Sequence, residues 1–285
     1  MKKDPASLRV AHLSDPHFSR VTYHPSQFLS KRWLGNLNLF LFRRKSYQTD
    51  HLGHIPELLD TLEVEQVFFT GDFSSTALDE EFEAAKAYVE SFSMPVSLLP
   101  GNHDAYTKEA ERSRRFYDFF PNTSLEKDRI EVTELGKGWW WIGLDCAVAT
   151  PLFHAYGLFT PEMEAKLEAH LQKLPEGARV ILGNHFPLYP SFHHTHDLKR
   201  NEALQKLLIR YPTVKLYLHG HDHKPYIKEK STPLVFNSGS CAHKPDGTFY
   251  LFDLFEEELL CQRLLFRKEN DTFSWVVDWQ KSFLF

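Results

Sequence analysis

Five short groups of metal-binding residue types recur between residues 15 and 223. Imidazole together with carboxylate or carboxamide oxygen, and without thiolate, suits Mn²⁺, Fe or Zn²⁺ better than structural zinc or calcium. Two Asp with four or five His exceed the coordination of one ion and predict two neighbouring ions, an arrangement that promotes in-line displacement at phosphorus. The groups are Asp15-Pro16-His17, Gly71-Asp72, Gly101-Asn102-His103-Asp104, Gly183-Asn184-His185 and Gly220-His221-Asp222-His223.

The spacing within these groups has geometric consequences. Residues two apart in extended backbone point to the same side. We therefore expect Asp15 with His17, and His221 with His223, each to grip one ion from one direction. Glycines beside Asp72 and in the other groups permit tight turns and close approach of the backbone.

Each group follows an apolar run predicted to be a strand, and α/β folds place their sites at the carboxyl ends of strands. The predicted strands are Leu8–Ser14, Gln66–Thr70, Val96–Leu99, Trp139–Leu144, Arg179–Gly183, Val214–Leu218, Leu234–Asn237, Thr248–Leu254, Leu259–Phe266 and Phe273–Asp278. The predicted helices are Ile55–Leu62, Leu78–Ser91, Lys108–Phe119, Pro161–Lys173 and Asn201–Arg210. Alternating strands and amphipathic helices favour an α/β or α+β sandwich.

The composition excludes several classes of protein. With 285 residues, 42% hydrophobic and 25% charged, the chain is typical of a globular protein. A net charge of −5 argues against a dedicated nucleic-acid binder. Three scattered Cys predict neither disulfides nor a zinc finger. We expect no signal peptide and no spanning helix, and hence a cytoplasmic protein.

The ordered set D-x-H, G-D, G-N-H-D, G-N-H and G-H-x-H resembles the calcineurin-like metallophosphoesterase superfamily. This resemblance implies a four-layer sandwich, in which two mixed β-sheets pack face to face and helices flank them. It further implies two divalent ions, with Mn²⁺ favoured over Fe or Zn²⁺. One ion would be bound by Asp15, His17 and His223, the other by Asn102, His185 and His221, with Asp72 bridging the two.

The resemblance also implies roles in catalysis. A hydroxide bridging the two ions would attack phosphorus in line. His103 would donate a proton to the leaving oxygen and stabilise charge, and Asp104 would orient His103.

We interpret residues 19–50 as an insertion within a single domain spanning residues 1–285. No Asp or Glu lies between Pro16 and Thr49, and nine of the fifteen residues of Phe28–Phe42 are large and apolar. Apolar and basic residues together suit a helical lid or contact with an anionic membrane surface. A helical hairpin packed on the protein's own core is the third alternative. The candidate substrate contacts are Trp33, Phe40, Arg43, Arg44 and His194.

Within the superfamily the chain resembles two groups, the chlamydial-type UDP-2,3-diacylglucosamine pyrophosphatases and the bacterial cyclic-nucleotide phosphodiesterase-like proteins. The leading hypothesis is hydrolysis of UDP-2,3-diacylglucosamine to UMP and 2,3-diacylglucosamine 1-phosphate in lipid A synthesis. An amphiphilic lipid-nucleotide and an anionic membrane would then be the partners, at the inner face of the cytoplasmic membrane, without nucleic acid or an obligate protein partner. The alternatives are a soluble cyclic-nucleotide or glycerophosphodiester phosphodiesterase and, in another class, a non-catalytic metal-binding scaffold.

Other residues have structural interpretations beside functional ones. His219, directly before the G-H-x-H group, is expected to be structural rather than a metal ligand. Asp145 either reaches the site or stabilises a turn. Trp139–Trp141 is expected in the sheet core. His196 and its neighbouring histidines either touch substrate or lie in a solvated loop.

Overall fold

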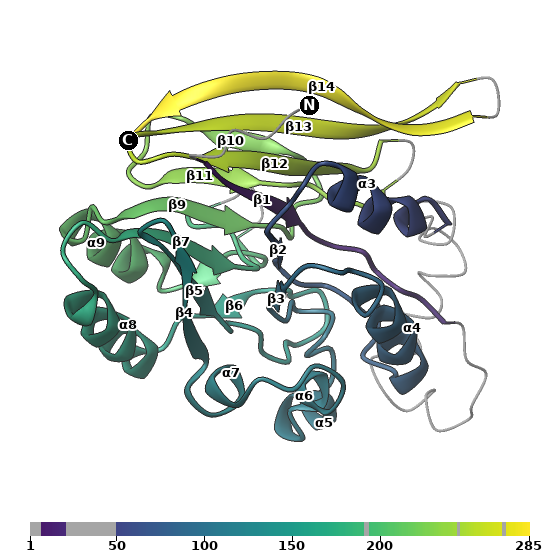
Figure 1. Ribbon diagram of the computed structural model, residues 1–285. Helices are drawn as coiled ribbons and strands as arrows, with labels where there is room; N and C mark the ends of the chain where they lie inside the picture. The colour runs from purple at the N-terminus through teal and green to yellow at the C-terminus, as the bar shows by residue number, and fades with distance from the viewer. Residues whose placement is uncertain (1–6, 21–49, 191–193, 244–245, 270–271) are drawn as a thin grey trace.

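Two six-stranded β-sheets stacked face to face form the centre of the molecule (Figure 1). The computed structural model describes residues 7–20, 50–190, 194–243, 246–269 and 272–285. The predicted insertion at 19–50 lies almost wholly outside these residues, and so do Trp33, Phe40, Arg43 and Arg44. The division into one domain with an insertion stays a prediction.

The first sheet has the order β14-β13-β12-β1-β2-β3. Its strands β1, β2 and β3 run parallel, whereas β12, β13 and β14 form an antiparallel meander beside β1. The sheet is therefore mixed, and the first strand of the chain is its parallel–antiparallel junction. The strands are β1 Leu8–Leu13, β2 Gln66–Phe69, β3 Val96–Leu98, β12 Thr248–Leu254, β13 Glu258–Glu269 and β14 Thr272–Leu284.

The second sheet has the order β10-β11-β9-β7-β5-β4, with β5, β7, β9 and β11 parallel and antiparallel strands at both edges. A two-stranded parallel pair, β6 with β8, lies apart from it. The strands are β4 Ile130–Gly136, β5 Trp139–Leu144, β6 Gly157–Leu158, β7 Arg179–Asn184, β8 Leu198–Lys199, β9 Val214–His219, β10 Tyr226–Lys228 and β11 Leu234–Asn237.

Helices cover the outer face of each sheet. Helix α8 shows why: Thr160 caps it through a hydrogen bond from Met163 N, and Met163, Leu167 and Leu171 bury one stripe. Helices α8 and α9 pack on the second sheet, while α3 and α4 belong to the core of the first (Figure 1). The helical segments are η3 Asp50–His54, α3 Ile55–Thr61, α4 Asp79–Val89, α5 Lys108–Arg112, α6 Arg115–Phe119, α7 Thr123–Asp128, α8 Pro161–Lys173 and α9 Asn201–Arg210.

Side-chain alternation along β5 divides the core into layers. Trp139 and Trp141 face the first sheet, and the Trp141 ring stacks on Phe68 with ring centroids 4.2 Å apart. Ile142 and Leu144 point the other way, into the core shared with α8 and α9. This pattern confirms the predicted four-layer sandwich and the predicted core position of Trp139–Trp141.

The structure differs from the prediction in several regions. The helix predicted over 108–119 is two short helices, because Arg114 between them is left-handed (φ 55°) and its side chain reaches the buried Asp145. The prediction lacks helix α7 and strands β4, β6, β8 and β10. All of these except the seven-residue β4 have six residues or fewer, which gives little periodicity to recognise.

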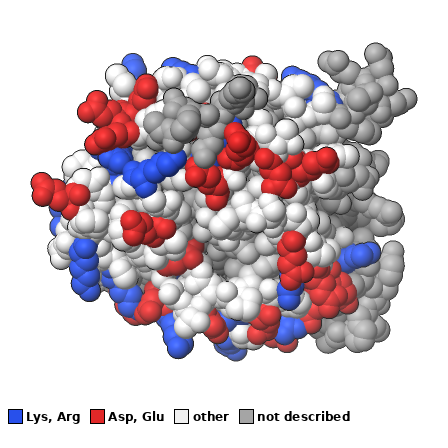
Figure 2. All heavy atoms as spheres, in the orientation of Figure 1, with Lys and Arg blue, Asp and Glu red and all other residues white. Residues whose placement is uncertain are grey.

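Among the described residues, no helix has the length and apolar content needed to cross a membrane. On the face shown in Figure 2, acidic and basic side chains are interspersed. That mixture agrees with the small net charge.

A buried ion pair joins β1 to its neighbour β12. Arg9 Nε and Nη2 donate to the two carboxylate oxygens of Asp253 at 2.7 and 2.9 Å, and Nη1 donates to the Leu62 carbonyl. Both side chains are almost wholly buried. Neither charge has access to water as an alternative partner.

We predict that Asp253→Ala destabilises the protein by about 3–5 kcal/mol, because the buried Arg9 guanidinium loses its carboxylate partner. Denaturant unfolding measures the loss. Glu229→Ala, which removes an exposed partner of Lys281, is the matched control and should stay within about 0.5 kcal/mol of the parent. Equal losses of stability in the two variants would contradict a stabilising role for the buried Arg9–Asp253 pair.

Candidate metal centre

The predicted metal-binding groups all converge at the carboxyl ends of parallel strands from both sheets. Backbone hydrogen bonds continue the pairing of β1 and β2 past the strand ends, from His17 N to Asp72 O and from Phe18 N to Phe73 O. This extension brings the loop after β1 alongside the loop after β2. The contributing strands are β1 for Asp15 and His17, β2 for Asp72, β3 for Asn102 and His103, β7 for His185, and β9 for His221 and His223.

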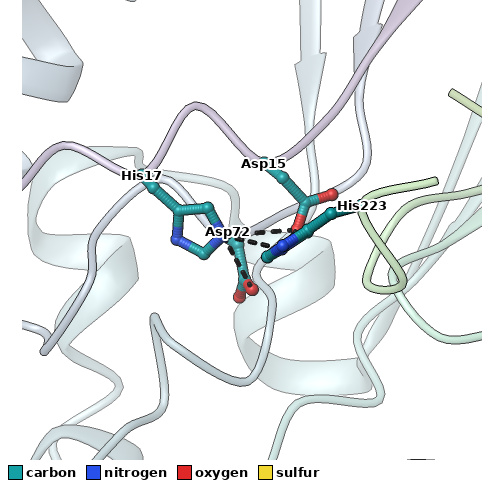
Figure 3. Close-up of side chains that lie close together, drawn as sticks. All are labelled: Asp15, His17, Asp72 and His223. Atoms are coloured by element: carbon teal, nitrogen blue, oxygen red, sulfur yellow. Dashed lines mark hydrogen bonds and ion pairs between the residues drawn. The ribbon is translucent and has the colours of Figure 1, made fainter. Parts of the chain in front are cut away.

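The first cluster consists of Asp15, His17, Asp72 and His223 (Figure 3), whose ligand atoms lie within 4.8 Å of one another. His17 Nε2 is 2.9 Å from His223 Nε2, 3.6 Å from Asp15 Oδ1 and 3.7 Å from Asp72 Oδ2. His223 Nε2 is 3.0 Å from Asp15 Oδ1. Two imidazole nitrogens pointing at one another between carboxylates call for a shared cation.

The second cluster consists of Asp72, His185 and His221, with Asn102 beside it. His185 Nε2 lies 3.4 Å from Asp72 Oδ2, 3.1 Å from Asn102 Oδ1 and 3.2 Å from His221 Nδ1. The His185 Nδ1–H donates a hydrogen bond to the Thr70 carbonyl at 2.7 Å. Nε2 of the same ring therefore points toward the second cluster. Asp72 is common to both clusters.

The groups converge as predicted, but extended backbone does not bring them together. Asp15, His17, His221 and His223 all have positive φ, between 47° and 75°, and are therefore not in extended backbone. His221 and His223 belong to different clusters and do not grip one ion from one direction. Left-handed conformations at candidate ligands are strained, and they persist where the surrounding structure over-determines them.

Two glycines are required by close approach. A Cβ on Gly101 would lie 2.1 Å from Asp72 Oδ1, and one on Gly220 would lie 2.2 Å from Asp15 Oδ2. Both contacts are shorter than any real Cβ contact. Glycine beside the candidate ligands is thus a steric necessity, as the sequence predicted.

Electrostatics within the clusters hold the carboxylates ionised. Burial alone would raise the pKa of Asp72, but His185 and His103 lower it far below its usual range. Burial likewise would raise the pKa of Asp15, which His223 and His17 keep low. Burial would lower the pKa of His185, yet the charge of Asp72 raises it to about 9. In the metal-free protein, a proton on His185 therefore compensates the negative charge of Asp72. A bound metal cation would compensate the same charge.

His103 lies beside the first cluster, as predicted, but Asp104 does not orient its ring. The His103 Nδ1–H donates to the Ser75 carbonyl at 2.7 Å, and the ring stacks against Tyr106 and meets the His17 ring edge-on. The Asp104 carboxylate instead accepts from Phe73 N, Ser74 N, Ser74 Oγ and Gly101 N. Buried backbone amides outcompete the imidazole because they have no other acceptor.

Three other histidines considered in the sequence lie outside both clusters. His194 is largely exposed, pairs with Asp197 and is not in either cluster. His196 comes closer, with its ring centroid 5.7 Å from that of His221. His219 is buried and structural, as expected, with Nε2 near the Tyr226 hydroxyl.

Asp145 is structural too. Its carboxylate is 1% exposed and pairs with Arg114 at 2.8 Å and Arg129 at 3.7 Å, and the Tyr117 hydroxyl donates to it. It therefore stabilises the turn after β5 and joins that turn to α6.

Comparison with known proteins identifies the family. The family described as calcineurin-like phosphoesterase matches residues 8–225. The chain belongs to this family.

A probable glycerophosphodiester phosphodiesterase from Arcobacter nitrofigilis is 27% identical over 182 residues, covering 62% of this chain and 63% of that protein. A 3′,5′-cyclic adenosine monophosphate phosphodiesterase from Haemophilus influenzae is 25% identical over 199 residues, covering 68% of each. The chain thus spans about two thirds of the length of these relatives.

Solved structures share the fold. A dimetal phosphatase from Danio rerio superposes with a TM-score of 0.67 at 15% identity, covering 91% of this chain and 96% of that one. A purple acid phosphatase from yellow lupin gives 0.60 at 14% identity, covering all of this chain and 55% of that one. At these identities the likeness concerns the fold alone.

The donor set fits the two divalent ions that the family implies. Each cluster combines imidazole with carboxylate oxygen, Asp72 belongs to both, and the described cysteines are all buried outside the clusters. Short nitrogen–nitrogen separations within each cluster are repulsive unless a proton or a cation lies between them. The residues do not discriminate among Mn²⁺, Fe and Zn²⁺.

We predict that Asp72→Ala lowers the metal content from about two ions per chain to fewer than one, because both clusters lose a ligand. Elemental analysis of the purified protein measures this content. Asp246→Ala, at an exposed carboxylate paired with Arg267, is the control. Retention of two ions by Asp72→Ala would show that the clusters are wrongly assigned.

Metal affinity should also depend on pH. Below about pH 9 the metal-free protein carries a proton on His185, and a metal must displace it. We expect the apparent affinity to fall about tenfold per pH unit from pH 9 to pH 7. Chelator competition at three pH values measures it, and the exposed His154→Ala variant should behave like the parent. A flat profile would exclude proton displacement from His185.

Proposed function

We propose that this protein is a binuclear metal-dependent phosphodiesterase. The observation that carries the proposal is the pair of clusters sharing Asp72, with the His103 imidazole beside them. Asp15, His17, Asp72 and His223 would hold one ion, and Asp72, Asn102, His185 and His221 the other.

Two divalent ions held there would act as Lewis acids toward a phosphoryl group and make water ionisable near neutral pH. The remaining chemistry belongs to the chain. The Nδ1–H of His103 donates to the Ser75 carbonyl, so the imidazolium form carries its transferable proton on Nε2; giving that proton to the leaving oxygen leaves the neutral ring with its proton on Nδ1. The backbone amide of His103 donates to Asp72 Oδ1 at 2.8 Å, which ties the acid to the shared ligand. Asp104 keeps the loops after β2 and β3 together.

A small-molecule phosphodiester is the substrate class that we favour, with a 3′,5′-cyclic nucleotide as the first candidate and a glycerophosphodiester as the second. The printed names of the relatives support this choice. The aromatic surroundings of the clusters suit an organic group: the Tyr106 ring stacks on His103, and the His196 ring meets His221 at an interplanar angle of 60°. Aromatic faces of this kind accept the flat surface of a nucleobase.

Hydrolysis of UDP-2,3-diacylglucosamine ranks below both phosphodiester reactions. Its support was the apolar and basic stretch Phe28–Phe42, which lies outside the described residues. The relatives named above are cyclic-nucleotide and glycerophosphodiester phosphodiesterases. Membrane contact, the preference for Mn²⁺ and a cytoplasmic location stay predictions, as does the absence of nucleic-acid and obligate protein partners.

A direct competition assay tests the proposal. The Mn²⁺-loaded protein is given cyclic AMP, glycerophosphocholine and detergent-dispersed UDP-2,3-diacylglucosamine in separate reactions, with Asp72→Ala as the blank. We expect release of AMP or glycerol phosphate to exceed release of UMP by at least about tenfold. Faster UMP release would instead establish the lipid A reaction and make 19–50 an acyl-chain lid. Bound metal without any turnover would favour the scaffold.

A further inference from the structure

The turn that follows Asp72 is held by two buried carboxylates rather than one. Asp104 takes the amides of Phe73 and Ser74. Glu81, near the start of α4, takes the next ones: its Oε2 accepts from Ser75 N at 3.2 Å, Thr76 N at 2.8 Å and Leu78 N at 3.3 Å. The amides of the turn are therefore divided between a carboxylate in the candidate site and one outside it.

Glu81 is a buried acid whose partners are neutral. It is 0% exposed, and burial raises its pKa, although amides from Thr76, Arg20 and Leu78 partly oppose this shift. Its Oε1 accepts from Arg20 N at 3.1 Å, on the chain segment that follows His17. A buried carboxylate tolerates this environment only when several donors satisfy it in fixed positions. Its geometry is therefore rigid.

The peptide between Ser75 and Thr76 connects Glu81 to the candidate acid. A trans peptide is planar, and its C=O and N–H point in opposite directions. The N–H of Thr76 donates to Glu81 on one side, and the C=O of Ser75 on the other side accepts from His103 Nδ1 at 2.7 Å. Any rotation of this peptide away from Glu81 moves the carbonyl away from His103.

Among the contacts of the described residues, the Ser75 carbonyl provides a hydrogen-bonding restraint on the plane of the His103 ring. Tyr106 stacks on His103 with an interplanar angle of 13°, and His17 meets it edge-on at 86°. These contacts limit tilt, but stacking alone does not select which nitrogen faces the clusters. The Ser75 carbonyl makes that selection by holding Nδ1–H, so that Nε2–H of the imidazolium is the proton directed at the clusters.

We propose that Glu81 is a positioning residue for proton donation by His103, acting through the Ser75–Thr76 peptide. This inference rests on the proposed function, since it needs His103 as the acid. The expected signature is dependence on the leaving group. An alkoxide leaving group needs the proton, whereas a nitrophenolate departs without it.

The experiment compares kcat and KM of Glu81→Gln on two substrates, an alkyl phosphodiester and bis(p-nitrophenyl) phosphate. Gln is isosteric but replaces one accepting oxygen with a donor. We expect kcat on the alkyl diester to fall by about 10–100-fold, the range for loss of a supporting hydrogen bond, with KM nearly unchanged. Activity on the aryl diester should stay within about threefold. Glu83→Gln, exposed on the same helix, is the matched control and should behave like the parent.

Two further variants keep the test decisive. Glu81→Asp retains the charge but withdraws the oxygens by one methylene, so it should show the same selectivity, and it replaces Glu81→Gln if that protein does not fold. In a His103→Gln background, Glu81→Gln should add no further loss on the alkyl diester. Equal losses on both substrates, or additive losses in the double variant, would overturn the proposal.

Failure of the proposed function looks different. A parent protein that hydrolyses neither diester refutes the phosphodiesterase assignment. A parent that hydrolyses both, together with a His103→Gln variant that is selective and a Glu81→Gln variant that is not, refutes only the role of Glu81.

Discussion

Asp72 holds a carboxylate at the point where both groups of candidate ligands meet, 3.7 Å from His17 Nε2 and 3.4 Å from His185 Nε2. A carboxylate at this position is buried, belongs to both clusters and needs hydrogen-bond donors to stabilise its charge. Support comes from the His103 amide and from the continued pairing of the loops after β1 and β2. Left-handed backbone at Asp72 (φ 57°) is the local cost of that position.

The surrounding sandwich makes this arrangement possible. Parallel strands end at a common edge, so loops distant in sequence meet there without long connections. The aromatic core between the sheets, with Trp141 stacked on Phe68, keeps the two edges in a fixed relation. Two buried acids, Asp104 and Glu81, then use the loop amides that the sheets leave unpaired.

Much of the fold and the candidate site could be predicted, because the informative residues are local. Glycine–Asp and Asn–His groups after apolar runs marked the strand ends, and each candidate ligand described here lies in a cluster or beside it. The roles of Asp104 and Glu81 could not be predicted, since they depend on which amides a tertiary turn leaves free. The break at Arg114 was equally inaccessible: it follows from the contact with Asp145, 31 residues further along the chain. The sequence Asp15-Pro16-His17 predicted that the two side chains lie at the candidate site. It did not predict the left-handed backbone that places them there.

The ligands of each cluster come from different sheets, and so a bound ion is also a cross-link between them. His223 from the second sheet meets Asp15 from the first, and His221 and His185 meet Asp72. Strand β1, which carries the first ligands, pairs with β12 from the C-terminal quarter of the chain. During synthesis, Asp15 and His17 are therefore made long before His223, the ligand that completes their cluster. Metal loading of this cluster must follow synthesis of His223, and the slow closure of the long-range pairings sets its earliest time.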